Sequence, residues 1–347
     1  MKSIVISSSS SWSLWKFRSF LLQKLSKRFE LIIFSKEKNF LDNIKIKNLN
    51  FQYHNFKKIL KNIFFLKKKK IQYFIEYDIK NLLFHCIAKL FLNYNLTVIW
   101  AGLGSYYNKK GYFSYLEILI LKILFLPVNK LIFINKYDKQ IIEKYKIFKN
   151  NFLIRSEGCN IKILKKKIYQ KKKYKFVLSA RPIIEKGILE YIEVARKNPD
   201  HEFYFYLIGN NKKEIFYNTK KIDVNLINTP KNFFIKSQVA NFKNELQRYD
   251  CLVSCSYGEG FGATLCDAAT AGINIISTKT NGPKYIFRKK SLIWCNTKSI
   301  NDLNEKIRKF AQIKVKKKID LIKNSQKDIL FTEENIIYKK IINIIFS

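Results

Sequence analysis

Short apolar runs alternate with longer stretches in which apolar residues recur every three or four positions, over nearly the whole chain. Such runs predict strands and the longer stretches predict amphipathic helices. Strands that alternate with helices are typical of a parallel sheet covered on both faces. In the first half we expect strands at 3–7, 31–35, 72–77, 97–101, 130–134 and 152–155, and helices near 14–27, 55–66, 79–92, 112–126 and 137–147.

The alternation breaks at residues 162–175, where eight of fourteen residues are lysine, and it then restarts. We place a domain boundary there: a first domain at 1–160, a basic linker at 161–175 and a second domain at 176–330. A basic surface helix is the alternative for the break. Residues 331–347 predict a last helix that packs back on the first domain. In the second domain we expect strands at 176–180, 203–208, 224–227, 251–255, 273–277 and 292–295, and helices at 187–197, 237–248, 262–271 and 300–311.

Tyr112 to Val128 is the most hydrophobic stretch, but it carries Glu117 and Lys122 and ends at Pro127. It is therefore too short and too charged to span a bilayer. We expect a helix packed in the core, and a helix lying on a membrane surface is the alternative.

The charge balance is extreme, with 66 basic and 26 acidic residues and a formal net charge of +40. Such a charge favours contact with nucleic acid or with an anionic membrane. A lysine-rich background composition of the kind an AT-rich genome produces is the alternative. Only eight of the basic residues are arginine, whereas proteins that read phosphates and bases use arginine heavily. The composition therefore argues against a nucleic-acid-binding protein.

The remaining reactive side chains show no metal or disulfide pattern. The six cysteines form no C-x-x-C pair and read as reduced thiols of a cytosolic protein. The three histidines, 54, 85 and 201, lie far apart, and no D-x-D triplet occurs. The N-terminal apolar run is too short for a secretory signal. We expect no metal and no cofactor.

Residues 251–278 contain no lysine or arginine, although the chain average predicts about five in such a window. The window holds only two charges, Glu259 and Asp267, and five of the eleven glycines lie at 258–282. It reads as a buried strand, a glycine loop at 258–262 and a helix of small residues. This order directs backbone N–H groups and a positive helix end at an anion. A packing turn is the alternative.

A second set of candidate residues follows the first strand of the second domain. Arg181 and Lys186 flank a short loop between that strand and a helix. Two cations at the carboxyl end of a strand are suited to neutralising a diphosphate.

These motifs resemble those of the retaining glycosyltransferases of family 4, which have the GT-B fold of two Rossmann-like doubly wound domains facing a cleft. The shared features are R-x4-K-G at 181–187, E-G-F-G-x4-D at 259–267 and Gly282-Pro283. Residues 11–18 and 102–107 resemble first-domain loops of members that transfer N-acetylhexosamine to undecaprenyl-diphosphate-linked or surface glycans. The first-domain cleft candidates are Ser10, Trp12, Arg18, Gly102 and Gly104.

The resemblance implies a role for each matching residue. Arg181 and Lys186 would hold the donor diphosphate in place of a metal, and Glu259 would bind sugar hydroxyls. The N–H groups of Gly260, Phe261 and Gly262 would contact sugar and phosphate. Asp267 would accept the ribose hydroxyls. It stands where the family usually has glutamate, which is one methylene longer.

A second departure lies in the first domain, where the family often has a histidine soon after the third expected strand. Here the segment is Glu76-Tyr77-Asp78-Ile79-Lys80, so we assign no catalytic histidine and expect His85 in a helix facing the core.

The function implied is transfer of a hexose or N-acetylhexosamine from a nucleotide sugar, UDP-linked by preference, to a lipid-linked or surface-glycan acceptor. The location implied is the cytoplasm, with peripheral attachment to the inner face of an anionic cell membrane. No specific nucleic acid partner is expected. The alternatives are an epimerase or phosphorylase of the same fold, a non-catalytic relative, and a basic nucleic-acid-binding protein.

Overall fold

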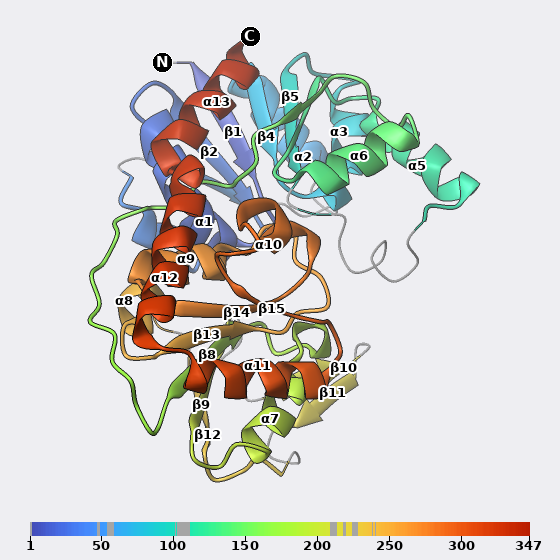
Figure 1. Ribbon diagram of the computed structural model, residues 1–347. Helices are drawn as coiled ribbons and strands as arrows, with labels where there is room; N and C mark the ends of the chain where they lie inside the picture. The colour runs from blue at the N-terminus through green and yellow to red at the C-terminus, as the bar shows by residue number, and fades with distance from the viewer. Residues whose placement is uncertain are drawn as a thin grey trace. The chain divides into compact units, whose positions relative to one another are not determined.

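The computed structural model describes residues 2–46, 49–53, 59–100, 102, 112–208, 214–217, 220–223, 228–237, 239 and 241–347. The chain divides into two compact units, Met1–Gly158 with Thr332–Ser347, and Cys159–Phe331. Each unit is built on a parallel sheet with helices on both faces (Figure 1). The predicted α/β class with two doubly wound domains is therefore confirmed.

The first unit contains a seven-stranded sheet in the order β3-β2-β1-β4-β5-β6-β7, with every neighbouring pair parallel. The strands are β1 (Ser3–Ser7), β2 (Glu30–Ser35), β3 (Asn50–Tyr53), β4 (Tyr73–Glu76), β5 (Asn95–Trp100), β6 (Lys130–Phe133) and β7 (Asn151–Leu153). The helical segments are α1 (Ser11–Leu25), η1 (Leu41–Ile44), α2 (Ile59–Lys68), η3 (Ile79–Asn81), α3 (Leu82–Ala88), α5 (Tyr115–Phe125), α6 (Lys136–Lys144) and α13 (Glu334–Phe346).

The strand order determines which helices share a face of this sheet. The chain moves from β1 outward to β3 and then returns through α2 to β4, so right-handed crossovers put α1 on one face and α2, α3, α5 and α6 on the other. One apolar core joins the second group, with Leu66 of α2, Phe84 of α3 and Phe125 packing with Phe34 and Phe74 of the sheet.

The last helix, α13, belongs to the first unit although it ends the chain. It contacts α1 on the α1 side of the sheet (Figure 1). The Phe346 ring stacks on Phe29 at 5.1 Å and meets Tyr73 of β4 edge-on at 4.7 Å. Lys130 Nζ donates to the Ile344 carbonyl oxygen at 2.7 Å. The first unit therefore includes residues from both ends of the chain.

Helix α5 packs on the core with one side only. Its first turn is closed by a capping box, in which the Ser114 N–H donates to Glu117 Oε2 at 2.7 Å and the Glu117 N–H donates to Ser114 Oγ at 3.3 Å. Only Phe125 of its eleven residues is buried. Ile118, Leu121 and Leu124 are partly buried and pack against the core, whereas the other apolar residues of the helix are exposed. Our prediction of a core helix therefore holds for one side of α5 only, because the sheet covers one side of a helix that carries apolar residues on both.

The second unit contains a six-stranded parallel sheet in the order β12-β9-β8-β13-β14-β15 and an antiparallel hairpin, β10-β11. The strands are β8 (Lys175–Ala180), β9 (Glu202–Leu207), β10 (Glu214–Tyr217), β11 (Lys220–Asp223), β12 (Phe233–Lys236), β13 (Cys251–Ser254), β14 (Asn274–Thr278) and β15 (Ile293–Cys295). The helical segments are η4 (Ile184–Lys186), α7 (Ile188–Arg196), α8 (Phe242–Leu246), α9 (Ala263–Ala271), α10 (Asn281–Ile286), α11 (Ile300–Gln312), α12 (Val315–Ile329) and η6 (Leu330–Thr332). The strand expected at 224–227 lies outside the described residues.

The basic segment at 161–175 belongs to the second unit. It contains no helix or strand before β8 and lies against the body of that unit. The Leu164 N–H donates to the Thr270 carbonyl oxygen at 2.8 Å, and Lys171 Nζ pairs with Asp250 Oδ1 at 2.6 Å. The alternative of a basic surface helix is therefore wrong.

No helix in the described ranges combines the length and the apolar character needed to cross a bilayer.

Candidate functional site

The strand order of the second sheet brings two loops together. From β8 the chain moves to β9 and β12, and after crossing back to β13 it moves the other way to β14 and β15. The reversal between β8 and β13 is a topological switch point, where doubly wound sheets bind ligands at the carboxyl ends of the strands. The loop that carries Arg181 and Lys186 follows β8, and the glycine loop follows β13.

An ion pair joins these two loops. Lys186 Nζ lies 2.5 Å from Glu259 Oε1, and Ser256 Oγ donates to the same oxygen at 2.9 Å. The side chains of Lys186 and Glu259 are only 16% and 22% exposed. The structure thus brings together two of the three residues predicted as catalytic. It adds Ser256, which lies three positions before Glu259, directly after the strand predicted at 251–255.

Arg181, the third predicted catalytic residue, lies immediately after β8 with its side chain exposed. No carboxylate in the described ranges forms an ion pair with it. It is therefore available to an anion at this sheet edge, unlike Lys186.

Close backbone contact fixes how the two loops meet. The Tyr257 N–H donates to the Glu185 carbonyl oxygen at 2.9 Å. Gly187 has φ +71°, and a Cβ there would lie 2.2 Å from the Cys255 carbonyl oxygen. Any other residue would push the loops apart, so the glycine of R-x4-K-G is needed for the ion pair to form.

A third segment, at Gly282, contacts the glycine loop. The Gly282 N–H donates to the Glu259 carbonyl oxygen at 2.9 Å. A Cβ on Gly282 would lie 2.7 Å from both that oxygen and the Phe261 nitrogen. Gly260 is half-buried in the loop, Phe261 is buried, and Gly262 is the N-cap of α9. The first turn of α9 therefore begins at the loop that carries Glu259.

Asp267 lies in the second turn of α9 and is half-buried. Cys266 and Ala268, its neighbours in the chain, are buried.

Cys255, directly after β13, has a structural part in the site. Its Sγ donates to the Gly187 carbonyl oxygen at 3.0 Å, and burial raises the pKa of the thiol. A protonated, buried thiol is a poor nucleophile. The side chain therefore stabilises the loop contact and takes no chemical role.

The first sheet has its own switch point, between β1 and β4. Ser10 is the N-cap of α1 there and accepts from the Ser13 N–H, while the Ser9 N–H donates to Asp78 Oδ2. The Trp12 indole N–H beside it is buried and has no hydrogen-bond partner in the described ranges. Gly102 follows β5 and is half-buried, whereas Gly104 lies outside the described residues.

Arg18, a predicted cleft residue, is committed to the interior of the first unit. It is 6% exposed, and Nη2 lies 3.0 Å from Glu157 Oε1. Nη1 donates to the Ser13 carbonyl oxygen at 3.0 Å, and the guanidinium lies 4.0 Å from the centre of the Tyr77 ring. The charge of Arg18 is thus already paired within the first unit.

The prediction that His85 is a helix residue facing the core is confirmed. It lies in α3, is fully buried, and forms hydrogen bonds with Tyr94 Oη at 2.8 Å and Glu76 Oε2 at 3.3 Å. Burial raises the pKa of the Tyr94 hydroxyl. The three side chains form a buried polar network at β4.

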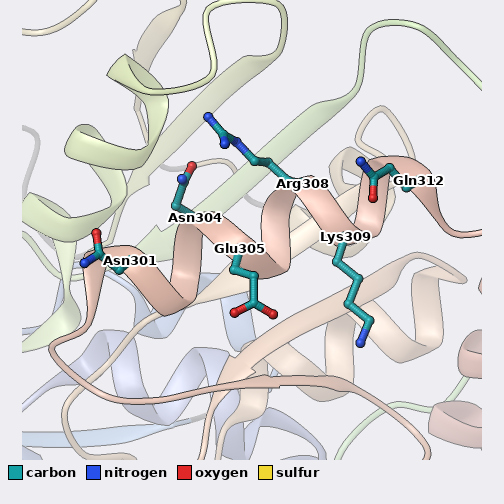
Figure 2. A pocket seen from close by; sticks show the side chains of 6 residues that line it. All are labelled: Asn301, Asn304, Glu305, Arg308, Lys309 and Gln312. Atoms are coloured by element: carbon teal, nitrogen blue, oxygen red, sulfur yellow. The ribbon is translucent and has the colours of Figure 1, made fainter.

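A separate surface pocket runs along α11 (Figure 2). Figure 2 shows the Arg308 and Lys309 side chains extending in different directions from the helix. All the lining side chains are polar and come from one helix, so they do not converge on a ligand. The lining residues are Asn301, Asn304, Glu305, Arg308, Lys309 and Gln312, and none is a predicted site residue.

Within the described ranges, no three side chains among His, Cys, Asp and Glu come together in a way that could hold a metal ion.

Comparison with known proteins adds to this geometry. Residues 160–328 match the family model of the glycosyl transferases group 1. The matched stretch contains both loops of the switch point. None of the curated proteins matches the chain.

Solved structures resemble the whole chain at low sequence identity. HepE (Alr3699) of Anabaena, solved with UDP and glucose, has a TM-score of 0.80 and 11% identity over 99% of each chain. Sucrose-phosphate synthase (tll1590) of Thermosynechococcus elongatus has a TM-score of 0.77 and 13% identity over 99% of this chain and 98% of its own. The lipopolysaccharide outer core galactosyltransferase WaaB, in its apo form, has a TM-score of 0.69 and 14% identity over 100% and 99%. These likenesses show that the chain has the GT-B fold.

Proposed function

We propose that this protein is a retaining glycosyltransferase that moves a hexose or N-acetylhexosamine from a UDP-sugar to a lipid-linked or surface-glycan acceptor. One observation carries the proposal: Lys186, Glu259 and Ser256 are held together at the switch point, beside the exposed Arg181, inside the segment that matches the glycosyl transferases group 1. The choice of UDP is supported by HepE, which was solved with UDP and glucose and with UDP-glucose.

In this proposal the donor diphosphate lies between Arg181 and Lys186. Glu259 accepts hydroxyls of the donor sugar and keeps Lys186 in place. The N–H groups of Gly260, Phe261 and Gly262 point at sugar and phosphate, where the start of α9 favours negative charge. Asp267 accepts the two ribose hydroxyls.

The proposed chemistry depends on charge stabilisation rather than on a protein nucleophile. As the bond from the sugar to the diphosphate breaks, negative charge grows on the leaving group, and the two cations stabilise it. The acceptor hydroxyl attacks from the same side and gives its proton to a leaving phosphate oxygen, so the anomeric configuration is retained. The cations take the part that a metal has in other transferases. We therefore expect transfer to continue in the presence of EDTA.

The proposed location is the cytoplasm, with peripheral attachment to the inner face of the cell membrane. A lipid-linked acceptor requires an enzyme to work at that surface, and a formal charge of +40 favours an anionic one.

The donor is tested by a thermal-shift screen of nucleoside diphosphates and of UDP- and GDP-sugars. A ligand that binds only the folded state, at 100 times its Kd, stabilises that state by about 2.7 kcal/mol. We expect the largest shift from UDP and one UDP-sugar. If no nucleotide shifts the transition, the proposal is wrong.

Calorimetry of Asp267→Ala tests the ribose contact. Loss of hydrogen bonds to a charged group should weaken UDP binding by about 1.5–3 kcal/mol. Glu305→Ala, an exposed carboxylate on α11, is the matched control and should bind UDP normally. Product analysis by NMR then separates transfer with retention from epimerisation or phosphorolysis, which release no new glycoside.

A further inference from the structure

Large apolar side chains are exposed mainly on one surface of the first unit. Twelve of the eighteen exposed ones in the described ranges lie on α2, α3, α5 and the turns beside them. We call this the α2–α3–α5 surface. Its members are Leu60, Phe64, Leu83, Leu90, Phe91, Tyr112, Tyr115, Leu116, Leu119, Ile120, Ile123 and Leu126.

These residues share a face of the molecule. The three helices cover the same side of the first sheet, as the strand order requires, and their inner sides pack into one core. Cys86 Sγ of α3 lies 3.8 Å from the Ile123 carbonyl oxygen of α5, so these two helices are in contact. Figure 1 shows α5 at the outer edge of this group.

The exposure is large for single residues. Tyr115 is 84% exposed, Leu126 79% and Leu116 64%. Single exposed apolar residues are common on protein surfaces. A group of them on neighbouring helices instead indicates a surface that contacts a membrane or another molecule.

The charges around the surface indicate what covers it. Exposed lysines accompany the apolar residues at Lys61, Lys67 and Lys68 on α2, at Lys80 before α3 and at Lys122 on α5. Across α2, α3 and α5 the single acid is Glu117, which the capping box uses. Two copies of the chain meeting here would bring these lysines together, which opposes self-association.

We propose that the α2–α3–α5 surface docks on an anionic phospholipid bilayer, with the apolar side chains of α5 inserted at the level of the headgroups and the lysines on the lipid phosphates. This is how interfacial helices bind, and tyrosines such as Tyr112 and Tyr115 suit the water–lipid boundary. The inference rests on the proposed function only in that it brings the enzyme to a lipid-linked acceptor.

Vesicle cosedimentation tests the surface without any assay of transfer. Wild-type protein should bind vesicles that contain phosphatidylglycerol, bind pure phosphatidylcholine weakly, and lose part of its binding at high salt. The triple variant Leu116→Ser/Ile120→Ser/Ile123→Ser should lose on the order of tenfold in partitioning, because it removes apolar area from the inserted helix. The double variant Leu330→Ser/Ile336→Ser changes exposed apolar residues elsewhere and should bind as wild type does.

A second measurement does not depend on loss of binding. The indole introduced by Leu116→Trp should be quenched by lipids with brominated acyl chains, and one introduced by Leu330→Trp should not. Equal vesicle binding by wild type and the triple variant would overturn the proposal and leave charge alone as the cause. A dimer in solution that the triple variant converts to monomer would also overturn it, in favour of a second copy.

The two proposals fail separately. UDP binding without vesicle binding removes the membrane surface and leaves the transferase. Vesicle binding without any nucleotide ligand removes the transferase and leaves the membrane surface.

Discussion

Lys186 and Glu259 neutralise each other at the proposed diphosphate site. Each side chain is mostly removed from water, so either charge alone would be costly, and the pair keeps both in place. Arg181 is exposed and has no such partner in the described ranges. A dianionic ligand therefore meets one cation that is already available and one that shares its charge with Glu259.

Arg181→Ala should lower turnover more than donor binding. The guanidinium stabilises charge that appears as the bond to the leaving group breaks, and loss of one such preorganised donor costs about 2–4 kcal/mol in the barrier. Steady-state kinetics with the UDP-sugar found by the screen would measure this as a fall in kcat. Arg308→Ala on α11 is the control, and near-normal turnover of Arg181→Ala would contradict the assignment.

The site residues of the second unit could be predicted because their pattern is local. Lys186 and Glu259 each follow a strand, and parallel strands that share a switch point bring their carboxyl ends together. Arg18 could not be assigned in this way. Its partner Glu157 lies 139 positions away, and nothing in the sequence around Arg18 shows that it is buried.

The window without lysine has a simple origin in the structure. Residues 251–278 form β13, the glycine loop, α9 and β14, and none of them is exposed. Most of that length is core, so lysine is excluded by burial as well as by the proposed site.

At the scale of the elements, the contact between Gly282 and the glycine loop should control donor binding. Gly282→Ala places a methyl group 2.7 Å from the Glu259 carbonyl oxygen and the Phe261 nitrogen, and the loop must move to relieve the clash. We expect UDP affinity to fall by about tenfold, which corresponds to about 1.4 kcal/mol. Calorimetry would measure it.

Asn281→Ala is the matched control, since it alters the neighbouring exposed residue without adding an atom next to the glycine loop. If both variants bind UDP equally well, the loop does not contact the donor.

The basic segment before β8 should make stability depend on pH. Lys166 Nζ donates to the Tyr249 carbonyl oxygen, and burial lowers the pKa of Lys166 to about 8. Between about pH 8 and the ordinary lysine value near 10.4, the unfolded chain binds more protons than the folded one at this position, so the free energy of unfolding should rise with pH.

Urea denaturation at several pH values would measure this contribution. In Lys166→Met the rise above about pH 8 should be smaller than in wild type. Lys162→Met, at an exposed position of the same segment, should follow the wild-type curve. Parallel curves for wild type and Lys166→Met would show that this amine is charged in the folded protein throughout.

Two of the elements that escaped prediction, β3 and α12, depart from the ordinary apolar pattern. Strand β3 has the sequence Asn50-Phe51-Gln52-Tyr53 and pairs only with β2 at the edge of the sheet, so it lacks the apolar run of a central strand. Helix α12 buries Lys318, which is 1% exposed and donates to Tyr174 Oη at 2.6 Å. A buried lysine breaks the apolar periodicity by which a helix is predicted.

At the scale of the whole molecule, the two units should differ in whether they fold alone. Residues 159–331 contain every strand of the second sheet and its own core, so this fragment should unfold cooperatively and bind UDP. Residues 1–158 lack α13, which buries Ile337, Ile341 and Ile345. Without it, apolar surface of the first unit is left open to water.

Calorimetric melting of the two fragments would measure the difference. We expect residues 1–158 to show no cooperative transition until a peptide of residues 332–347 is added. A cooperative transition of the first fragment alone would show that α13 is dispensable.

Helix α13 also sets an order of events during protein synthesis. A ribosome makes the chain from its N-terminus, and domains generally fold as units in that order. Here the first unit cannot be completed until residues 332–347 have been translated, and these follow all the residues of the second unit. The second unit can therefore finish folding before the first. Until residues 332–347 are made, the apolar surface that α13 covers beside α1 stays exposed to water, and a ribosome-bound chaperone would meet this surface.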